Sequence, residues 1–379
     1  MAVTISRPVR RRPVFHPLPV FAVDRLTDDA VAVTFAVPSA VRETFRFAAG
    51  QHLTVRLVDP AGGPDVRRSY SICSTPAELD DHGRLRIGVR QVPGGAFSGY
   101  AVRQLTVGAT VDVLPPLGNF TTGFAPQRSR HYGMLAGGSG ITPVLSLLAT
   151  GLATEPASRF TLIFGNRSAH TVMFADEIAD LKDRYPTRLQ VVHVLSREVT
   201  GAQLLSGRID AARFGQLLDT LVPGDRIDEW FLCGPYGLVT AAQQVLGDRG
   251  VPAGAVHSEL FHAGDAPTVA TPAEPVPAAA EATGAEATGA EVTVLLDGRA
   301  STVRMQPGER VLDAALRVRS ELPYACRGGV CSTCRAKVVD GAVTMVRNYA
   351  LEPDELAAGY VLTCQSSPTT DRLTVDYDA

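Results

Sequence analysis

Four of the six cysteines lie in the last sixty residues of this 379-residue chain, and their spacing constrains that region more than any other feature. They follow the pattern C-x4-C-x2-C with a distant fourth cysteine, and are Cys326, Cys331, Cys334 and Cys364. The other two, Cys73 and Cys233, stand far apart in the first two thirds of the chain. Such clustering indicates a metal site in a reducing compartment and argues against a disulfide framework.

The spacing also favours one kind of metal centre. Three thiolates from one loop and a fourth from a remote strand are the plant-type ligand set of a [2Fe–2S] cluster. Gly328 and Gly329 would let backbone N–H groups approach the sulfides without a Cβ in the way. Zinc is the alternative, but zinc ribbons use two closely spaced cysteine pairs, and here the fourth ligand stands alone. We therefore expect iron and sulfide.

Length and composition limit the class of protein. At roughly 150 residues per domain, a chain of 379 residues predicts two or three domains. Lys and Arg total 36 and Asp and Glu total 39, so no global positive field attracts nucleic acid or an anionic membrane. The basic start, residues 1–13, lacks the apolar core of a signal peptide, and no apolar run is long enough to span a membrane. We predict a disordered tail there and a cytoplasmic protein; nothing indicates the oligomeric state.

One segment divides the chain. Residues 264–290 contain ten Ala and four Pro but only two Val as larger apolar residues. Such a composition cannot bury enough apolar surface to offset the entropy of ordering it, which predicts a flexible linker. It separates residues 1–263 from a module of residues 291–379.

The hydrophobic pattern changes twice along the chain. Over residues 14–126 short alternating runs such as HLTVRLV and RLRIGVR predict an antiparallel sheet or barrel. Over residues 127–263 near-continuous apolar strands alternate with helical stretches, which predicts a doubly wound parallel sheet. The module at 291–379 reads as α+β, with a helix at VLDAALRVR, a hairpin at RAKVVDGAVT and a last strand at RLTVDYD.

A glycine-rich turn joins a strand to a helix in the second domain. In LAGGSGITPVLSLLATG, Gly137, Gly138 and Gly140 would clear space for a diphosphate at the positive end of the helix. Thr142 is the expected N-cap. Taken alone the pattern is weak, because a proline stands where the third glycine of the dinucleotide fingerprint would be.

Two further stretches follow apolar strands of the same sheet. Arg167 and Ser168 stand where an acidic residue would hold the ribose of NADH, so they favour the 2′-phosphate of NADPH, with NADH as the alternative. The stretch CGPYG, which includes Cys233, Gly234 and Pro235, would lie on the same carboxyl edge of the sheet. On spacing alone Cys233 could equally be an inert core thiol.

Together these residues resemble the ferredoxin–NADP reductase superfamily with an added plant-type ferredoxin domain. The stretch RSYS is similar to the flavin motif of that family, and GGAFSGYAV is similar to its second flavin element. The resemblance implies an FAD-binding barrel, an NAD(P)-binding α/β domain and a β-grasp ferredoxin domain. It implies contact with FAD for Arg68, Ser69, Tyr70, Ser71, Gly95, Phe97 and Ser98, and catalytic roles for Tyr70, Ser71 and Cys233.

The stretch NYALEPDELAAGYVLTCQSSP, residues 348–368, is most similar to reductase subunits of bacterial phenylacetyl-CoA epoxidases. Reductases of ring-hydroxylating and steroid-hydroxylating oxygenases share the domain order and are the alternative. Free-standing reductases of the family end in a tyrosine that covers the flavin, whereas the corresponding strand here reads HSELF. Phe261 is a candidate cover, with ordinary core packing as the alternative.

The resemblance implies a serial transfer of electrons. A nicotinamide gives two electrons as hydride, a [2Fe–2S] cluster accepts one, and FAD can do both, so FAD stands between them. The expected acceptor is a separate oxygenase or epoxidase. A different class, a non-catalytic iron–sulfur carrier or a zinc-stabilised binding module, would make the flavin and nucleotide motifs coincidences.

Overall fold

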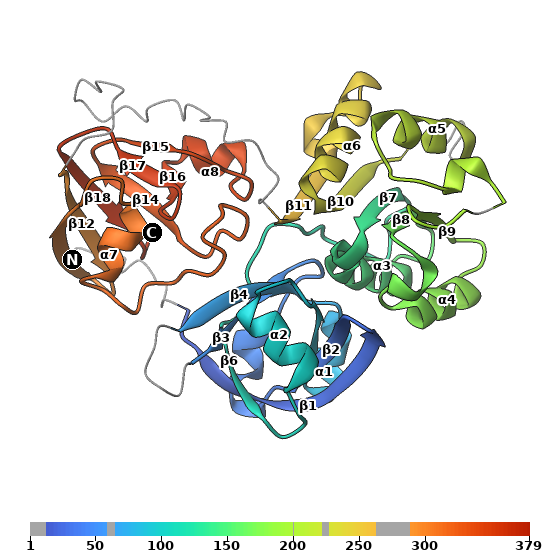
Figure 1. The fold of residues 1–379 in the computed structure, drawn as a ribbon, viewed down its shortest axis with the longest axis horizontal. Helices are drawn as coiled ribbons and strands as arrows, with labels where there is room; N and C mark the ends of the chain where they lie inside the picture. The colour runs from blue at the N-terminus through green and yellow to red at the C-terminus, as the bar shows by residue number, and fades with distance from the viewer. Residues whose placement is uncertain (1–12, 59–64, 200, 222–226, 263–288) are drawn as a thin grey trace, which may run out of the picture. The chain divides into compact units, whose positions relative to one another are not determined.

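The computed structural model describes residues 13–58, 65–199, 201–221, 227–262 and 289–379. They belong to two compact units, one of Phe15–Ala266 and one that includes Pro267–Ala379 (Figure 1). Residues 1–12 of the predicted tail and 264–288 of the predicted linker lie outside the described residues. The antiparallel barrel, the parallel sheet and the α+β module expected from the sequence are all present.

The first part of the larger unit is a six-stranded antiparallel barrel in the order β4-β3-β6-β1-β2-β5. A bridge between Ile72 and Ile87 joins the end of β4 to β5 and closes it. Its elements are β1 (His16–Thr27), β2 (Ala30–Ala36), the 3-10 helix η1 (Ser39–Phe45), β3 (His52–Leu57), β4 (Val66–Ser71), α1 (Pro76–His82), β5 (Arg84–Arg90), α2 (Ala96–Arg103) and β6 (Thr110–Val113).

Strand β5 shows how the alternating pattern builds this barrel. Leu85, Ile87 and Val89 are fully buried in the barrel core. Because successive side chains of a strand point to opposite faces, Arg84, Arg86 and Arg90 lie on the outer face. Two of these arginines, Arg86 and Arg90, reach the neighbouring α/β domain.

The second part of the larger unit is a five-stranded parallel sheet in the order β11-β10-β7-β8-β9. Its strands are β7 (His131–Gly137), β8 (Arg159–Asn166), β9 (Leu189–Leu195), β10 (Glu229–Pro235) and β11 (Val256–His262). Its helices are α3 (Ile141–Thr154), α4 (Ala175–Arg184), α5 (Ala211–Leu221) and α6 (Tyr236–Asp248), with 3-10 turns η2 (Gly138–Gly140), η3 (Ala169–Thr171), η4 (Gln203–Leu205) and η5 (Ala253–Ala255).

Helices cover both faces of this sheet (Figure 1). Met134 of β7 belongs to the core cluster that includes Leu148 of α3 and Ile178 of α4. On the opposite face Trp230 of β10 packs edge-on against Phe214 of α5, with ring centroids 5.8 Å apart. The strand order reverses between β7 and β10, which makes the loops after these two strands the flanks of the topological switch point, where ligands bind in such sheets.

The smaller unit is built on a five-stranded mixed sheet in the order β13-β12-β18-β14-β16, in which only β12 and β18 are parallel. A two-stranded sheet of β15 and β17 accompanies it. The elements are β12 (Glu291–Leu296), β13 (Arg299–Arg304), α7 (Val311–Leu316), β14 (Arg335–Asp340), β15 (Val343–Met345), α8 (Pro353–Ala357), β16 (Tyr360–Leu362), β17 (Ser366–Pro368) and β18 (Arg372–Asp376).

The hairpin predicted at RAKVVDGAVT is wrong. β14 pairs with β16 and β18 in the main sheet, whereas β15 pairs with β17 in the small one. At the turn between them Gly341 has φ +84°, and a Cβ there would lie 2.3 Å from the carbonyl oxygen of Arg372. The turn therefore packs against the start of β18, and long-range pairing takes the place of the local hairpin.

Candidate functional site

The RSYS stretch forms the end of strand β4, at one edge of the barrel. Arg68 is exposed, and its Nη1 donates to the carbonyl oxygen of Arg67 at 2.7 Å. Ser69 lies half-buried with its Oγ 3.5 Å from Thr54 Oγ1. The half-buried Tyr70 ring packs against Phe97 with centroids 5.3 Å apart, and burial raises the pKa of Tyr70 well above its usual value.

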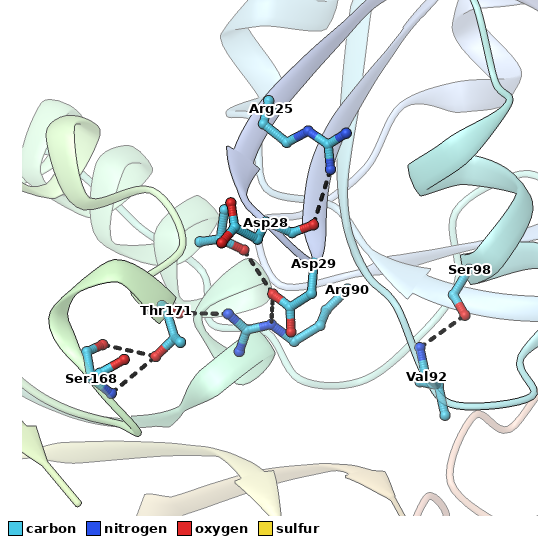
Figure 2. Close-up of polar contacts among 9 residues, drawn as sticks. Arg25, Asp28, Asp29, Arg90, Val92, Ser98, Ser168 and Thr171 are labelled. Atoms are coloured by element: carbon cyan, nitrogen blue, oxygen red, sulfur yellow. Dashed lines mark hydrogen bonds and ion pairs between the residues drawn. The ribbon is translucent and has the colours of Figure 1, made fainter. Parts of the chain in front are cut away.

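Helix α2 begins beside that ring. Gly95 is its N-cap residue and offers no side chain to the first helical N–H groups. Ser98 Oγ accepts a hydrogen bond from the Val92 amide at 3.1 Å (Figure 2). It also donates to the Gly95 carbonyl at 3.4 Å, which holds the turn closed. The amides at this helix start remain available to a phosphate, as an FAD site requires.

The glycines of the turn after β7 are constrained by close packing against β10 and α6, in addition to any requirement of a ligand. A Cβ on Gly140 would lie 2.3 Å from the Cys233 carbonyl oxygen, and one on Gly137 would lie 2.6 Å from Leu238 Cδ2. Gly138 has φ +55°, which favours glycine. Gly137 and Gly140 are therefore required because the end of β10 and the start of α6 approach so closely.

Thr142 is not the N-cap of helix α3, contrary to expectation. The helix begins at Ile141 with Gly140 as its N-cap, so Thr142 lies inside the first turn and is 1% exposed. Its Oγ1 donates to the Ser139 carbonyl at 3.0 Å. Because glycine cannot cap with a side chain, α3, like α2, starts with amides that no side chain satisfies.

The barrel and the parallel sheet meet in one polar cluster at the switch point. Ser71 Oγ donates a 2.6 Å hydrogen bond to Glu259 Oε1 of β11, across 188 residues of sequence. Cys233 is fully buried at the end of β10, where burial and then the nearby Glu259 carboxylate raise the pKa of its thiol well above normal. Gly234 (φ +154°) and Pro235 follow it and lie against Gly137. Ser71 and Cys233 thus both lie near the Glu259 carboxylate.

Arg167 and Ser168 follow strand β8 on the same carboxyl edge. Arg167 is exposed, while Ser168 is held in a capping turn with Thr171, whose Oγ1 accepts from the Ser168 amide at 3.1 Å (Figure 2). Glu198 Oε1 accepts from the Ala169 amide at 2.9 Å. A guanidinium and a carboxylate therefore flank this turn together.

Phe261 is half-buried and packs against the core cluster of the α/β domain. This contact agrees with the alternative expected for Phe261, ordinary core packing.

The four cysteines predicted to hold the cluster form two pairs in the smaller unit. Cys326 lies beside Cys331, and Cys334 lies beside Cys364. The neighbouring Cys334 lowers the pKa of Cys364. No three His, Cys, Asp or Glu side chains within the described ranges are arranged around a single metal ion. Two pairs are what two irons, each with two cysteines, require.

Backbone amides and one side chain point at these sulfur atoms. The Gly328 amide lies 3.3 Å from Cys326 Sγ and the Cys326 amide 3.5 Å from Cys331 Sγ. Gln365 Nε2 lies 3.5 Å from Cys364 Sγ. Donors of this kind stabilise thiolates and bound sulfide, so the residues present fit an iron–sulfur cluster.

Sequence reasoning did not select Gln365 or Arg90, which lie against Cys364 and Gly138, and it named Glu259 only as a residue that the family resemblance could bring near the flavin. Glu259 stands in a strand whose pattern gives no sign of a partner in the barrel, and Gln365 is marked only by following Cys364. Arg90 belongs to an alternating strand and looks like an ordinary outward-facing cation. Only three-dimensional contact identifies them.

Three family models match consecutive parts of the chain: the oxidoreductase FAD-binding domain over residues 17–122, the oxidoreductase NAD-binding domain over 134–244, and the 2Fe-2S iron-sulfur cluster binding domain over 294–369. No helix of the described residues is both long and apolar enough to cross a membrane.

Curated relatives extend over nearly the whole chain. It is 44% identical over 368 residues to a subunit of the 1,2-phenylacetyl-CoA epoxidase of Escherichia coli (strain K12), covering 96% of this chain and 98% of that protein. It is 34% identical over 363 residues to the ferredoxin reductase component of 3-ketosteroid-9-alpha-monooxygenase from Rhodococcus rhodochrous, covering 95% and 96%.

Solved structures share the fold. Phthalate dioxygenase reductase, described as a modular structure for electron transfer from pyridine nucleotides to [2Fe-2S], matches with a TM-score of 0.56 at 22% identity, covering 96% of this chain and 98% of that one. An intact type IV self-sufficient cytochrome P450 monooxygenase matches with a TM-score of 0.65 at 23% identity, where this chain spans 42% of that protein.

The barrel edge, the switch-point cluster and the paired cysteines thus occur in the order of the three matched domains. The chain belongs to the family of modular oxygenase reductases, and it is an NAD(P)H oxidoreductase whose electron path runs from pyridine nucleotide through FAD to a [2Fe–2S] cluster.

Proposed function

We propose that this reductase delivers single electrons to a separate phenylacetyl-CoA epoxidase component in the cytoplasm. The proposal is supported by 44% identity to an epoxidase subunit, against 34% to a steroid monooxygenase reductase, each over more than nine tenths of both proteins. A reductase of the same build that serves a steroid-hydroxylating oxygenase is the second candidate.

The hydrogen bond between Ser71 and Glu259 is the observation that best supports a serial transfer of electrons from nucleotide to flavin to cluster. When bound, pyridine nucleotide, FAD and the cluster convert a two-electron donation into single-electron deliveries. For that exchange the flavin-motif edge of the barrel must lie beside the nucleotide edge of the parallel sheet. Ser71 belongs to the first edge and Glu259 to the second, and their 2.6 Å contact brings the two edges together.

The catalytic residues in this proposal are Ser71, Tyr70 and Cys233. Glu259 orients the Ser71 hydroxyl by accepting its hydrogen bond, so that the O–H points to the carboxylate and the Oγ lone pairs remain open toward the flavin side. Tyr70 would pack its ring on the flavin, supported from behind by Phe97. The buried Cys233 stays protonated, because its pKa lies well above normal, and so presents a neutral thiol at the switch point.

The remaining flavin-site residues hold and position the cofactor. Arg68 is exposed and can meet a diphosphate, and the uncapped start of α2 at Gly95 adds backbone donors. Ser98 keeps that start in place through the Val92 amide, and Ser69 lies beside Arg68 on the same strand. Phe261 is proposed as the aromatic residue nearest the flavin on β11.

For the nucleotide, we propose binding at Gly137, Gly138, Gly140 and Thr142, with Gly234 and Pro235 on the other side of the switch point. Exposed Arg167, followed by Ser168, supports a preference for NADPH over NADH. Glu198 beside the same turn opposes a 2′-phosphate, so the preference should be modest.

In the smaller unit Cys326, Cys331, Cys334 and Cys364 would hold the cluster. The domains, bounded at 14–126, 127–263 and 291–379, would then supply the three steps in order.

Anaerobic mixing with NADPH followed by oxygenase reconstitution tests the proposal. The expected result is reduction of the flavin absorbance, then of the cluster absorbance, and turnover of phenylacetyl-CoA when an epoxidase oxygenase component is added. Turnover only with a steroid oxygenase component would select the second candidate. A preparation that contains zinc and no iron after anaerobic isolation would contradict both.

A further inference from the structure

Cys364 is the remote member of the four predicted cluster ligands, and its two neighbours in sequence tie it to the loop that carries the other three. It lies in the turn between β16 and β17. Before it, Thr363 is fully buried, and its Oγ1 donates to the Cys334 carbonyl at 2.9 Å. After it, Gln365 is 8% exposed, and its Nε2 donates to the Arg327 carbonyl at 2.8 Å. The two contacts reach opposite ends of the ligand loop and hold the turn of Cys364 across it.

The amide of Gln365 also faces Cys364 itself. Its Nε2 lies 2.9 Å from the Cys364 carbonyl oxygen and 3.5 Å from Cys364 Sγ. Because these atoms and the Arg327 carbonyl oxygen are all acceptors, the nitrogen of the amide, not its oxygen, must face them. The amide has two N–H groups, so one is directed to Arg327 and the other is shared between the oxygen and the sulfur of Cys364.

The stem of Gln365 packs against the ligand loop. A Cβ on Gly329, which has φ +78°, would lie 3.1 Å from Gln365 Cγ. Arg327 has φ +53°, a left-handed conformation that costs energy for a residue with a side chain and persists only where the surroundings hold it. Between these two residues the Gly328 amide lies 3.3 Å from Cys326 Sγ. Gln365 therefore contacts the loop on both sides of an amide that faces the other sulfur pair.

We propose that Gln365 is a positioning residue of the [2Fe–2S] site. It holds the turn of Cys364 against the loop of the other three ligands and keeps the Gly328 amide directed at Cys326 Sγ. Reduction adds one negative charge to the cluster, and N–H groups beside the sulfur ligands stabilise that charge. Gln365 thus slows the loss of iron and raises the reduction potential of the cluster. The inference rests on the proposed cluster ligands and adds a residue that makes no bond to iron.

Redox titration of the full-length holoprotein tests this role. Gln365→Leu replaces the amide by an apolar side chain of similar size and removes both N–H donors. It should lower the ratio of reduced to oxidised cluster at a fixed potential about tenfold, which is about 59 mV for a one-electron couple. The electron paramagnetic resonance g-values of the reduced cluster should also shift, because the sulfur of Cys364 is no longer held in the same position.

Release of iron to an excess of chelator is the second measurement. In Gln365→Leu it should be about tenfold faster than in the wild type, the effect of losing one hydrogen bond that holds the ligand turn. Gln365→Asn keeps a buried amide but is one methylene shorter, so it no longer reaches the Arg327 carbonyl. It should change the potential and the release rate in the same directions as Gln365→Leu, by smaller factors.

Gln306→Leu, at an exposed glutamine of the same unit, is the matched control and should keep the wild-type potential and iron release. Wild-type values in either Gln365 variant would overturn the inference, as would equal changes in Gln306→Leu. Where Gln365→Leu assembles no cluster, Gln365→Asn alone decides. A wild-type holoprotein that contains zinc and no iron would instead contradict the proposed function, so the two failures are distinguishable.

Discussion

Ser71 at the end of β4 and Glu259 on β11 are joined by a 2.6 Å hydrogen bond, although 188 residues separate them in sequence. This contact fixes the barrel edge that carries the flavin motif against the nucleotide edge of the parallel sheet. Replacing Ser71 by Ala should leave FAD bound and slow NADPH-driven flavin reduction by about tenfold to a hundredfold, since an oriented hydroxyl is lost. Stopped-flow absorbance measures the rate. Ser129→Ala, at an exposed serine whose Oγ donates to the Ala157 carbonyl, is the control and should keep most of that rate.

Arg68 is exposed and donates to the Arg67 carbonyl through Nη1, which leaves the rest of its guanidinium open to a diphosphate. Arg68→Ala should lower FAD occupancy and raise the dissociation constant for FAD about tenfold or more, the effect of losing one charge-assisted contact. The flavin-to-protein absorbance ratio after gel filtration reports this. Arg103→Ala on α2 is a matched exposed arginine, and equal FAD loss in both variants would remove Arg68 from the flavin site.

Cys334 and Cys364 form one of the two sulfur pairs. Cys334→Ser should abolish single-electron delivery to the oxygenase while the NADPH-driven reduction of a dye that accepts electrons from the flavin persists. Iron content and oxygenase turnover are the measurements. Cys73→Ala, which removes a buried thiol in the barrel, should retain iron. Loss of dye reduction in a folded Cys334→Ser protein that keeps FAD would contradict the serial path.

Glu155 is fully buried and accepts hydrogen bonds from the Ala125 amide at 3.0 Å, Tyr132 Oη at 3.0 Å and Ser158 Oγ at 2.6 Å. Glu155→Ala leaves these three donors unpaired and should destabilise the protein by about 3 kcal/mol. Thermal unfolding of the holoprotein checks this. Asp219→Ala, at an exposed ion pair with Arg249, should change stability by less than about 1 kcal/mol.

Burial, followed by the Glu155 charge, raises the pKa of Tyr132 to about 12 from an ordinary value of 10.0. The raised pKa favours the neutral phenol in the folded state. The stability that comes from this raised pKa of Tyr132 is therefore fully present below pH 10. As the pH rises toward 12, about 2 to 3 kcal/mol of unfolding free energy is lost. The difference in unfolding free energy between wild type and Tyr132→Phe should narrow over this range. A constant difference would show that Tyr132 does not titrate there.

Two features of the site, the cysteine loop and the glycine-rich turn, are formed by residues close together in the chain, and both could be predicted from the sequence. Three of the four predicted cluster ligands lie in one loop of nine residues, from Cys326 to Cys334, so their spacing alone indicates a cluster. The glycine-rich turn after β7 was expected for the same reason. Its helix start was displaced, because Gly140 packs against the Cys233 carbonyl and takes the N-cap position that Thr142 was expected to fill.

The sequence by itself determined the three-part organisation and the strand periods, because each depends on residues close together in the chain. The tertiary structure alone decided that Ser71 meets Glu259, that Arg90 faces the glycine-rich turn, and that β14 pairs with β18 in place of β15. Pairing between distant strands and across two domains depends on which surfaces bury each other. A local pattern fixes which face of a strand is apolar, but not which partner covers it.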